Sequence, residues 1–388
     1  MPRSELSAEV LRLRDVAAVI ADEVIAPAAA LIDEQALWPA ANMAALGKAG
    51  LLGLHIPRRL GGEEQGLLAL SVIAEELGRA CSSTAMCFSM HSVAAKVMAA
   101  KATSDQEERF LRPIAEGRHI TSLALSEAGT GVHFFLPRTT FKPVTDGFEL
   151  NGEKSFVTSG AEADSYVFSA VEEGSELDPG SFTCLAVEKE ASGLTWRDAW
   201  RGYGMRGNSS RAVGLDAVFV PRDNLLGAPG DQVWYVFEVV APYFLVAMAG
   251  VYLGIARAAL EAAIHHLRSR RHEHTGKSLS EVPVLWGEVA EAWTEVQSTR
   301  QLIRYAARLF DAGSTEAPLA LFAAKARVAQ TANSVTDAAM ILMGGRAYAD
   351  NSTIARLHRD ARAANVMSPT THLLETWLGR SLLGLPLL

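Results

Sequence analysis

The chain has 388 residues, of which 49% are hydrophobic and 21% charged, and its formal net charge is −8 at pH 7. This length requires more than one packed core, and the apolar content excludes an intrinsically disordered chain. The negative balance gives no general attraction to nucleic acid or to anionic membranes. Cys81, Cys87 and Cys184 have no metal-ligand spacing and form no even-numbered disulfide set, which indicates a reducing cytoplasm.

The first part of the chain has the apolar spacing of helices. Residues 67–77 and 92–100 carry the 3.6-residue period, and residues 58–62 and 102–105 interrupt it. Within the second interruption, a Thr-Ser-Asp run precedes an acidic first turn, which is typical of a helix start. We therefore predict an N-terminal helical domain over residues 1–120.

The pattern changes at about residue 121, where Gly, Ser, Thr and β-branched residues become frequent. Asp146-Gly147 and Asn151-Gly152 are dipeptides that accept positive φ in tight turns, so both are predicted to be turns. Short strands are predicted at residues 148–150, 155–158, 165–170, 182–187 and 217–220. These features predict a middle β-domain over residues 121–230.

The helical pattern returns after residue 231 and continues to the C-terminus. Long helices are predicted within residues 258–267, 284–310 and 318–343, as in an antiparallel bundle. Residues 239–256 contain no charged residue. A stretch of this length is at the lower limit for a membrane span. We favour a buried core helix there, and therefore a C-terminal helical bundle over residues 231–388 and no membrane association.

Four motifs lie in order along the three predicted domains. They occupy residues 124–131 (Ala-Leu-Ser-Glu-Ala-Gly-Thr-Gly), 151–160 (Asn-Gly-Glu-Lys-Ser-Phe-Val-Thr-Ser-Gly), 204–210 (Gly-Met-Arg-Gly-Asn-Ser-Ser), and 344–348 with 359–362 (Gly-Gly-Arg-Ala-Tyr, then Arg-Asp-Ala-Arg). Together they resemble the signatures of the acyl-CoA dehydrogenase family. The resemblance implies a mainly α fold with a central β-domain: an N-terminal helical domain, a middle β-barrel or sandwich and a C-terminal four-helix bundle.

The resemblance also implies an FAD-dependent oxidoreductase that acts on an acyl thioester of CoA or of an acyl carrier protein. A flavin ring needs hydrogen bonds at its pyrimidine edge and N5, and apolar contact on one face. By similarity, Leu125 and Ser126 would lie at the pyrimidine edge and Thr158 near N5. Phe156, in place of the usual tryptophan, would pack against the ring. Gly131 and Ser159 complete this part of the expected cofactor site.

In the family a second subunit helps to hold the FAD pyrophosphate. By this resemblance Arg271 would be the corresponding phosphate contact, although its register is off by one residue, and Gly344 and Gly345 would form the Gly-Gly loop. The resemblance thus implies a homodimer or homotetramer, and a flavoprotein or reductase as electron acceptor. Ile341 replaces the family's glutamine before this loop.

The family's catalytic glutamate is missing from both positions where it usually occurs. Ser368 stands at the position near the C-terminus, and Phe244 stands at the position on the core helix. An unactivated hydroxyl is a weak base for an α-proton at neutral pH. Candidate catalytic residues are therefore Ser368, Tyr243 and His91.

Two other functions remain open at this point. Flavin-dependent monooxygenases of the same fold use a serine and histidines near the flavin, and His91 and Ser159 resemble two of these residues. The third, a histidine, aligns with Met367. Without a base, the chain is also compatible with non-oxidative chemistry or with a flavoprotein that has lost catalysis.

Overall fold

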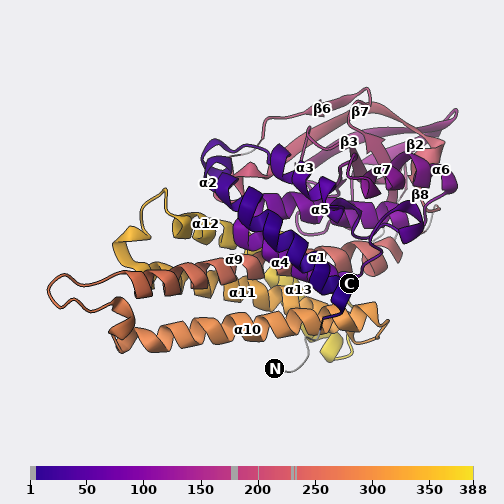
Figure 1. Ribbon diagram of the computed structural model, residues 1–388. Helices are drawn as coiled ribbons and strands as arrows, with labels where there is room; N and C mark the ends of the chain where they lie inside the picture. The colour runs from indigo at the N-terminus through magenta and orange to yellow at the C-terminus, as the bar shows by residue number, and fades with distance from the viewer. Residues whose placement is uncertain (1–5, 176–181, 200, 229–230, 232–233, 388) are drawn as a thin grey trace.

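The computed structural model describes residues 6–175, 182–199, 201–228, 231 and 234–387, which form a helical, a β and a second helical region in chain order (Figure 1). The predicted α-β-α organisation is confirmed, and β1 begins at Thr121. The helices of the first region are α1 (Ala8–Ile20), α2 (Ala26–Gln35), α3 (Ala40–Lys48), α4 (Leu67–Ala80), α5 (Ser82–Ala100), α6 (Ser104–Gln106) and α7 (Arg112–Ala115), with π-helical turns η1 (Ala21–Ile25) and η4 (Glu107–Leu111). The predicted helix start is confirmed, because Thr103 and Gln106 form a reciprocal capping box.

The β region is one eight-stranded sheet with its own apolar core. Its strands are β1 (Thr121–Ala124), β2 (Thr140–Val144), β3 (Gly147–Val157), β4 (Ser165–Glu172), β5 (Phe182–Glu188), β6 (Leu194–Trp196), β7 (Arg211–Pro221) and β8 (Leu225–Leu226). The strand order is β6-β7-β3-β2-β4-β5-β8, and β1 pairs in parallel with β4. The two motifs of the expected flavin site therefore follow β1 and lie along β3.

One of the two predicted turns is correct and the other is wrong. Asp146 has φ +62° in the tight turn between β2 and β3, where Val144 pairs with Gly147. Asn151-Gly152 instead lies inside β3, at an irregularity in its pairing with β7. Gly152 has φ +148°, and a Cβ there would lie 2.8 Å from Thr139 Cα. The dipeptide therefore permits a bulge within a long strand rather than ending it.

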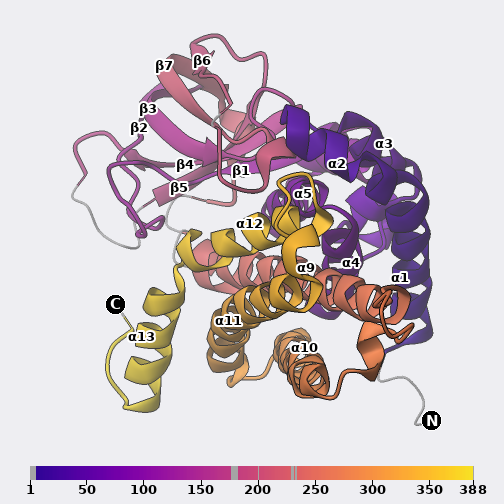
Figure 2. The ribbon, with the colours of Figure 1, turned by 90° about the vertical axis from the view of Figure 1, so that its left-hand side faces the viewer.

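The C-terminal helices are α9 (Ala241–Ser269), which extends the π-helical segment η7 (Tyr235–Val240), α10 (Val284–Asp311), α11 (Ala317–Met343), α12 (Thr353–Val366) and α13 (Thr371–Leu382). Tyr235–Ser269 is long and apolar enough to cross a membrane, but 94% of its most apolar window is buried inside the protein. It packs against α4, α10, α11 and α12, so the prediction of a core helix is confirmed. Helix α12 lies between the sheet and helices α9 and α11 (Figure 2).

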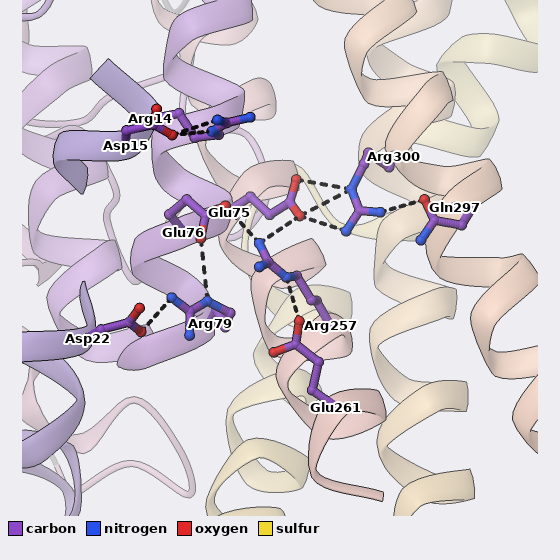
Figure 3. Close-up of polar contacts among 10 residues, drawn as sticks. All are labelled: Arg14, Asp15, Asp22, Glu75, Glu76, Arg79, Arg257, Glu261, Gln297 and Arg300. Atoms are coloured by element: carbon purple, nitrogen blue, oxygen red, sulfur yellow. Dashed lines mark hydrogen bonds and ion pairs between the residues drawn. The ribbon is translucent and has the colours of Figure 1, made fainter. Parts of the chain in front are cut away.

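Ion pairs join the two helical regions (Figure 3). Glu75 on α4 is buried and accepts hydrogen bonds from Arg300 on α10, with Nη2 2.7 Å from Oε1. Its neighbour Glu76 accepts from Arg257 on α9 at 2.7 Å. Because both arginines come from the C-terminal bundle, this network fixes α4 against the helix that carries Phe244.

Candidate active site

A cavity of about 530 Å³ lies where the three regions meet. Its wall is built from α5, the loop after β1, β3 with the residue that follows it, the loop before β7, the start of α9, and the end of α12 with the turn after it. Most of the lining side chains are apolar, and a few hydroxyls, the Asn208 carboxamide and one carboxylate interrupt them. Such a concave apolar site with few polar groups is typical of a small-molecule or cofactor site.

Most of the residues expected near the flavin line this cavity: Leu125, Ser126, Gly131, Phe156 and Thr158. Gly131 has φ +55°, a left-handed conformation that glycine adopts without strain. Phe156 has φ +57°, and its residue surface is 59% exposed. The two motifs are also joined directly, because the Ser155 amide donates to the Ser126 carbonyl at 2.8 Å.

Hydroxyl groups from both motifs and from the loop before β7 face this space. Ser126, Thr158 and Ser210 line the cavity, and their hydroxyls make no hydrogen bond to another residue in the described parts of the chain. The Thr158 carbonyl is already occupied, because it accepts from the Ser122 hydroxyl at 2.7 Å. The side-chain hydroxyls are therefore available to a bound group with polar edges, as a flavin ring has.

A buried ion pair lies directly behind the first motif. Lys154 Nζ is 2.7 Å from Glu127 Oε1, and both side chains are nearly inaccessible to solvent. Glu127 also accepts from the amides of Arg138 at 2.7 Å and Thr139 at 3.0 Å. Burial lowers the pKa of Lys154 to about 8, whereas the Lys154 ammonium and these hydrogen bonds hold the pKa of the Glu127 carboxyl below its usual value despite burial. The pair is therefore charged at pH 7 and internally neutralised.

The two positions at which the sequence led us to expect the family's glutamate both line the cavity. Phe244 comes from α9, and Ser368 comes from the turn between α12 and α13. The Ser368 hydroxyl donates to the Val132 carbonyl at 2.8 Å. Among the described residues that line the cavity, Glu127 is the only carboxylate, and it forms an ion pair with Lys154. Among these described lining residues there is therefore no free carboxylate to act as a base.

Tyr243 does not line the cavity, although Phe244 beside it does. Its ring packs edge-on against His55 at 4.9 Å and Phe310 at 5.9 Å between ring centroids. Burial raises the pKa of the Tyr243 phenol, which is opposite to what a base at neutral pH needs. The structure thus gives Tyr243 a packing role and no contact with the cavity.

His91 is also outside the cavity lining, and both ring nitrogens are occupied. Nδ1 accepts from the Thr121 amide at 3.1 Å, so Nε2 carries the hydrogen and donates to the Leu52 carbonyl at 2.9 Å. Burial lowers the pKa of His91 to about 4, so the ring is neutral at pH 7. Ser159 is likewise turned to other partners: its hydroxyl accepts from Trp38 Nε1 at 3.1 Å. These contacts give no support to the monooxygenase reading.

The residues expected to contact FAD from a second subunit lie away from the cavity of their own chain. Arg271 is exposed in the loop after α9, where it donates to the Gly276 carbonyl at 3.0 Å. Gly344 and Gly345 follow α11 at the surface, with open space where a Cβ would stand. A single chain does not bring these three residues to the cavity.

Arg359 and Asp360 belong to the last motif, but nothing in the sequence indicates what this pair holds in place. Asp360 is buried and accepts hydrogen bonds from the Ser82 hydroxyl and from the Met205 amide. Arg359 pairs with Asp33 on α2 and donates to the Tyr203 carbonyl at 3.0 Å. Met205 lines the cavity, so the pair fixes one wall of the site from α12.

Models of the acyl-CoA dehydrogenase N-terminal, middle and C-terminal domains match residues 7–118, 122–218 and 243–383. The chain is 31% identical to cyclohex-1-ene-1-carbonyl-CoA dehydrogenase of Geobacter metallireducens over 375 aligned residues. The alignment covers 95% of this chain and 96% of that protein. It is 27% identical over 362 residues to a short-chain specific acyl-CoA dehydrogenase of Clostridium acetobutylicum, which covers 92% and 94%. The structure of butyryl-CoA dehydrogenase from Megasphaera elsdenii superposes with a TM-score of 0.92 at 23% identity, over 98% of this chain and 100% of that one, and shows the shared fold.

Proposed function

Because this chain belongs to the acyl-CoA dehydrogenase family, we propose that its cavity oxidises acyl thioesters whose acyl group carries no charge. The chain is a flavin-dependent oxidoreductase with FAD as its cofactor and an acyl thioester as its substrate. When bound, FAD supplies the acceptor for the two electrons that leave the substrate as hydride. The charge limit on the acyl group is inferred from the cavity wall.

The residues of the two motifs suit a flavin ring. Ser126 and Thr158 offer hydroxyls that have no partner within the described chain, and Leu125 and Phe156 offer apolar surface beside them. Gly131 leaves open space at the loop, with nothing within 4 Å of where a Cβ would stand. We assign the pyrimidine edge of the ring to Leu125 and Ser126, and the N5 side to Thr158. Ser159 follows Thr158 in the chain and supports it indirectly, because its hydroxyl accepts a hydrogen bond from Trp38.

The neutral cavity wall is the observation that supports uncharged acyl groups as the substrate class. Glu127 is the only charged side chain among the described lining residues, and Lys154 neutralises it from behind. A carboxylate on the acyl group would lose its hydration and find no cation to pair with. An uncharged acyl group instead meets apolar side chains such as Met90, Val240 and Phe244. The cavity therefore favours uncharged acyl groups.

Ser368 is the candidate catalytic residue that the geometry supports best. Of the three candidates from the sequence, it alone lines the cavity. Its hydroxyl donates to Val132, so its oxygen lone pairs remain as acceptors for a substrate proton or a bridging water. A hydroxyl is a poor base, which predicts slow proton removal from ordinary saturated thioesters.

We further propose that two or four copies of the chain assemble, and that Arg271, Gly344 and Gly345 of one copy contact the FAD of another. The exposure of all three residues is compatible with such a role. The acyl group is carried by CoA or by a carrier protein, the electrons leave to a flavoprotein or reductase, and the enzyme works in the cytoplasm. Size-exclusion chromatography with light scattering tests the assembly. We expect the wild-type protein to be a dimer or tetramer, and we expect Arg271→Ala to dissociate it and to release FAD.

The substrate class is tested by mixing FAD-loaded protein anaerobically with butyryl-CoA and, separately, with glutaryl-CoA. We expect butyryl-CoA to bleach the visible flavin absorbance at least about tenfold faster, because only glutaryl-CoA has a charged acyl group, whose carboxylate would enter the cavity without a cation to pair with. Faster bleaching by glutaryl-CoA would contradict the charge limit. Absence of bleaching by every member of a chain-length series of thioesters with uncharged acyl groups would contradict the oxidation itself.

A further inference from the structure

Lys325 on α11 is fully buried, although lysine is rarely buried without a partner charge. Its Nζ donates to the carbonyls of Ala364 at 2.9 Å, Met367 at 3.3 Å and Pro369 at 2.9 Å. In the described parts of the chain its Nζ forms no ion pair with a carboxylate, and no charged neighbour contributes to its pKa. Burial lowers the pKa of Lys325 to about 8, so the group remains charged at pH 7. All three ammonium hydrogens are thus directed to the backbone of one short segment.

That segment joins the end of one helix to the start of the next. Helix α12 ends at Val366 with no basic residue in its own last turn, so its terminal carbonyls need donors from elsewhere. A cation at this end also compensates the negative end of the helix dipole. The carbonyl of Pro369 directly precedes Thr370, the N-cap of α13. Lys325 therefore holds both helix ends from a third helix.

The same segment forms a wall of the cavity. Val366, Met367, Ser368 and Pro369 all line it, whereas Lys325 does not. Two more contacts hold the segment: the Tyr252 hydroxyl on α9 lies 2.9 Å from Met367 Sδ, and Ser368 donates to Val132 in the first motif loop. The wall is thereby fixed to the bundle on one side and to the expected flavin loop on the other.

We propose that Lys325 is a positioning residue, which fixes residues 366–369 as the wall against which the acyl thioester is held for oxidation. This inference rests on the function proposed above for the cavity. Lys325 touches neither substrate nor cofactor, and it acts only through the carbonyls of the segment. Removing its ammonium leaves three carbonyls without their donor and frees the wall to take other conformations.

The test uses FAD-loaded Lys325→Met, which keeps the volume of the side chain but removes the donors. The matched control is Val328→Ala, because Val328 is equally buried on the same helix and has no polar side-chain atom. Hydrogen exchange is measured at the same interval below the melting temperature of each variant. We expect exchange of the amides of residues 364–370 to rise about tenfold more in Lys325→Met than in Val328→Ala.

The second readout is kinetic. With butyryl-CoA as probe, Lys325→Met is expected to raise KM about tenfold, with the spectrum of the oxidised flavin unchanged. Equal exchange in the two variants, or faster exchange with KM at the wild-type value, would overturn the proposal. Failure of the wild-type protein to react with thioesters that have uncharged acyl groups would instead count against the proposed function, since the exchange measurement needs no substrate.

Discussion

The Lys154 ammonium and the Glu127 carboxylate form a buried ion pair, 2.7 Å apart, that joins the two motifs lining the cavity. Lys154 lies on β3 and Glu127 in the loop after β1, so the pair ties the strand that carries Phe156 to the loop that carries Ser126. The Ser169 hydroxyl accepts a further hydrogen bond from Lys154 at 3.0 Å. The pair has two consequences, a rigid cavity wall and a wall without net charge.

Lys154→Met is predicted to destabilise the protein strongly, because it leaves the Glu127 carboxylate buried without its cation. The expected loss in the free energy of unfolding is about 3–5 kcal/mol, measured by denaturant unfolding of the FAD-free protein. The double variant Lys154→Met with Glu127→Gln should lose less than the sum of the two single changes. Additive losses would show that the two side chains do not act as a pair.

Thr158→Val is predicted to weaken FAD binding or slow its reduction, because it removes the hydroxyl assigned to the N5 side of the ring. The change keeps the shape of the side chain, and we expect an effect of about tenfold, in the range of one lost hydrogen bond. Flavin absorbance and stopped-flow bleaching report the two quantities. Thr195→Val, an exposed change on β6, serves as the control. A Thr158→Val protein that matches wild type in both would refute the assignment.

Ser368→Glu is predicted to increase the rate of flavin bleaching by butyryl-CoA, because it places a carboxylate on the cavity wall where none is free. General bases contribute roughly 10²- to 10⁴-fold, so a gain of about tenfold or more is expected even with imperfect geometry. Ser368→Ala should slow bleaching if the hydroxyl takes part in proton transfer. Rates that are the same in wild type, Ser368→Ala and Ser368→Glu would remove Ser368 from the mechanism.

Acid stability tests the structural role of His91. Burial lowers the pKa of its imidazole from 6.5 to about 4, so between these values the unfolded chain binds a proton that the folded chain does not. The free energy of unfolding therefore decreases as pH falls through this window, by at most about 3 kcal/mol from this residue.

His91→Gln removes this titration while its amide still has a donor for Leu52 and an acceptor for Thr121. Stability measured from pH 7 to pH 4 should fall less steeply than in wild type, and flavin reduction by butyryl-CoA should persist. His55, whose pKa burial lowers to about 3, is present in both proteins, and because His91 is the smallest cause of that shift, most of the His55 contribution is common to the two. Lost reduction with an unaltered pH slope would restore His91 as a catalytic candidate.

The fold was predictable from the sequence where apolar spacing is regular. Residues 284–310 were predicted to be helical, and α10 spans Val284–Asp311. The error at Asn151-Gly152 arose because pairing of β3 with β7 outweighs the local preference of that dipeptide for a turn.

The residues of the candidate site were predictable where a sequence motif specifies the backbone conformation. They were not predictable where the rotation of a helix determines which of its side chains face the cavity. Neighbours on a helix point about 100° apart, so Phe244 faces the cavity and Tyr243 faces Phe310. Lys325 lies on the buried face of α11 with Leu321 and Val328, and this spacing among apolar residues predicts a buried lysine. Its acceptors could not be inferred, because they lie at the end of another helix.

The central claim is that this cavity oxidises an acyl thioester with an uncharged acyl group, using FAD. The most direct measurement is the mass of butyryl-CoA, or of a homologue with another uncharged acyl group, recovered after one anaerobic turnover on FAD-loaded protein. Flavin absorbance is recorded in the same sample. We predict that the thioester loses two hydrogen atoms for each flavin bleached. A thioester recovered unchanged with the flavin still oxidised across the whole series, or one that gains an oxygen atom only when oxygen and reduced flavin are supplied, would contradict it.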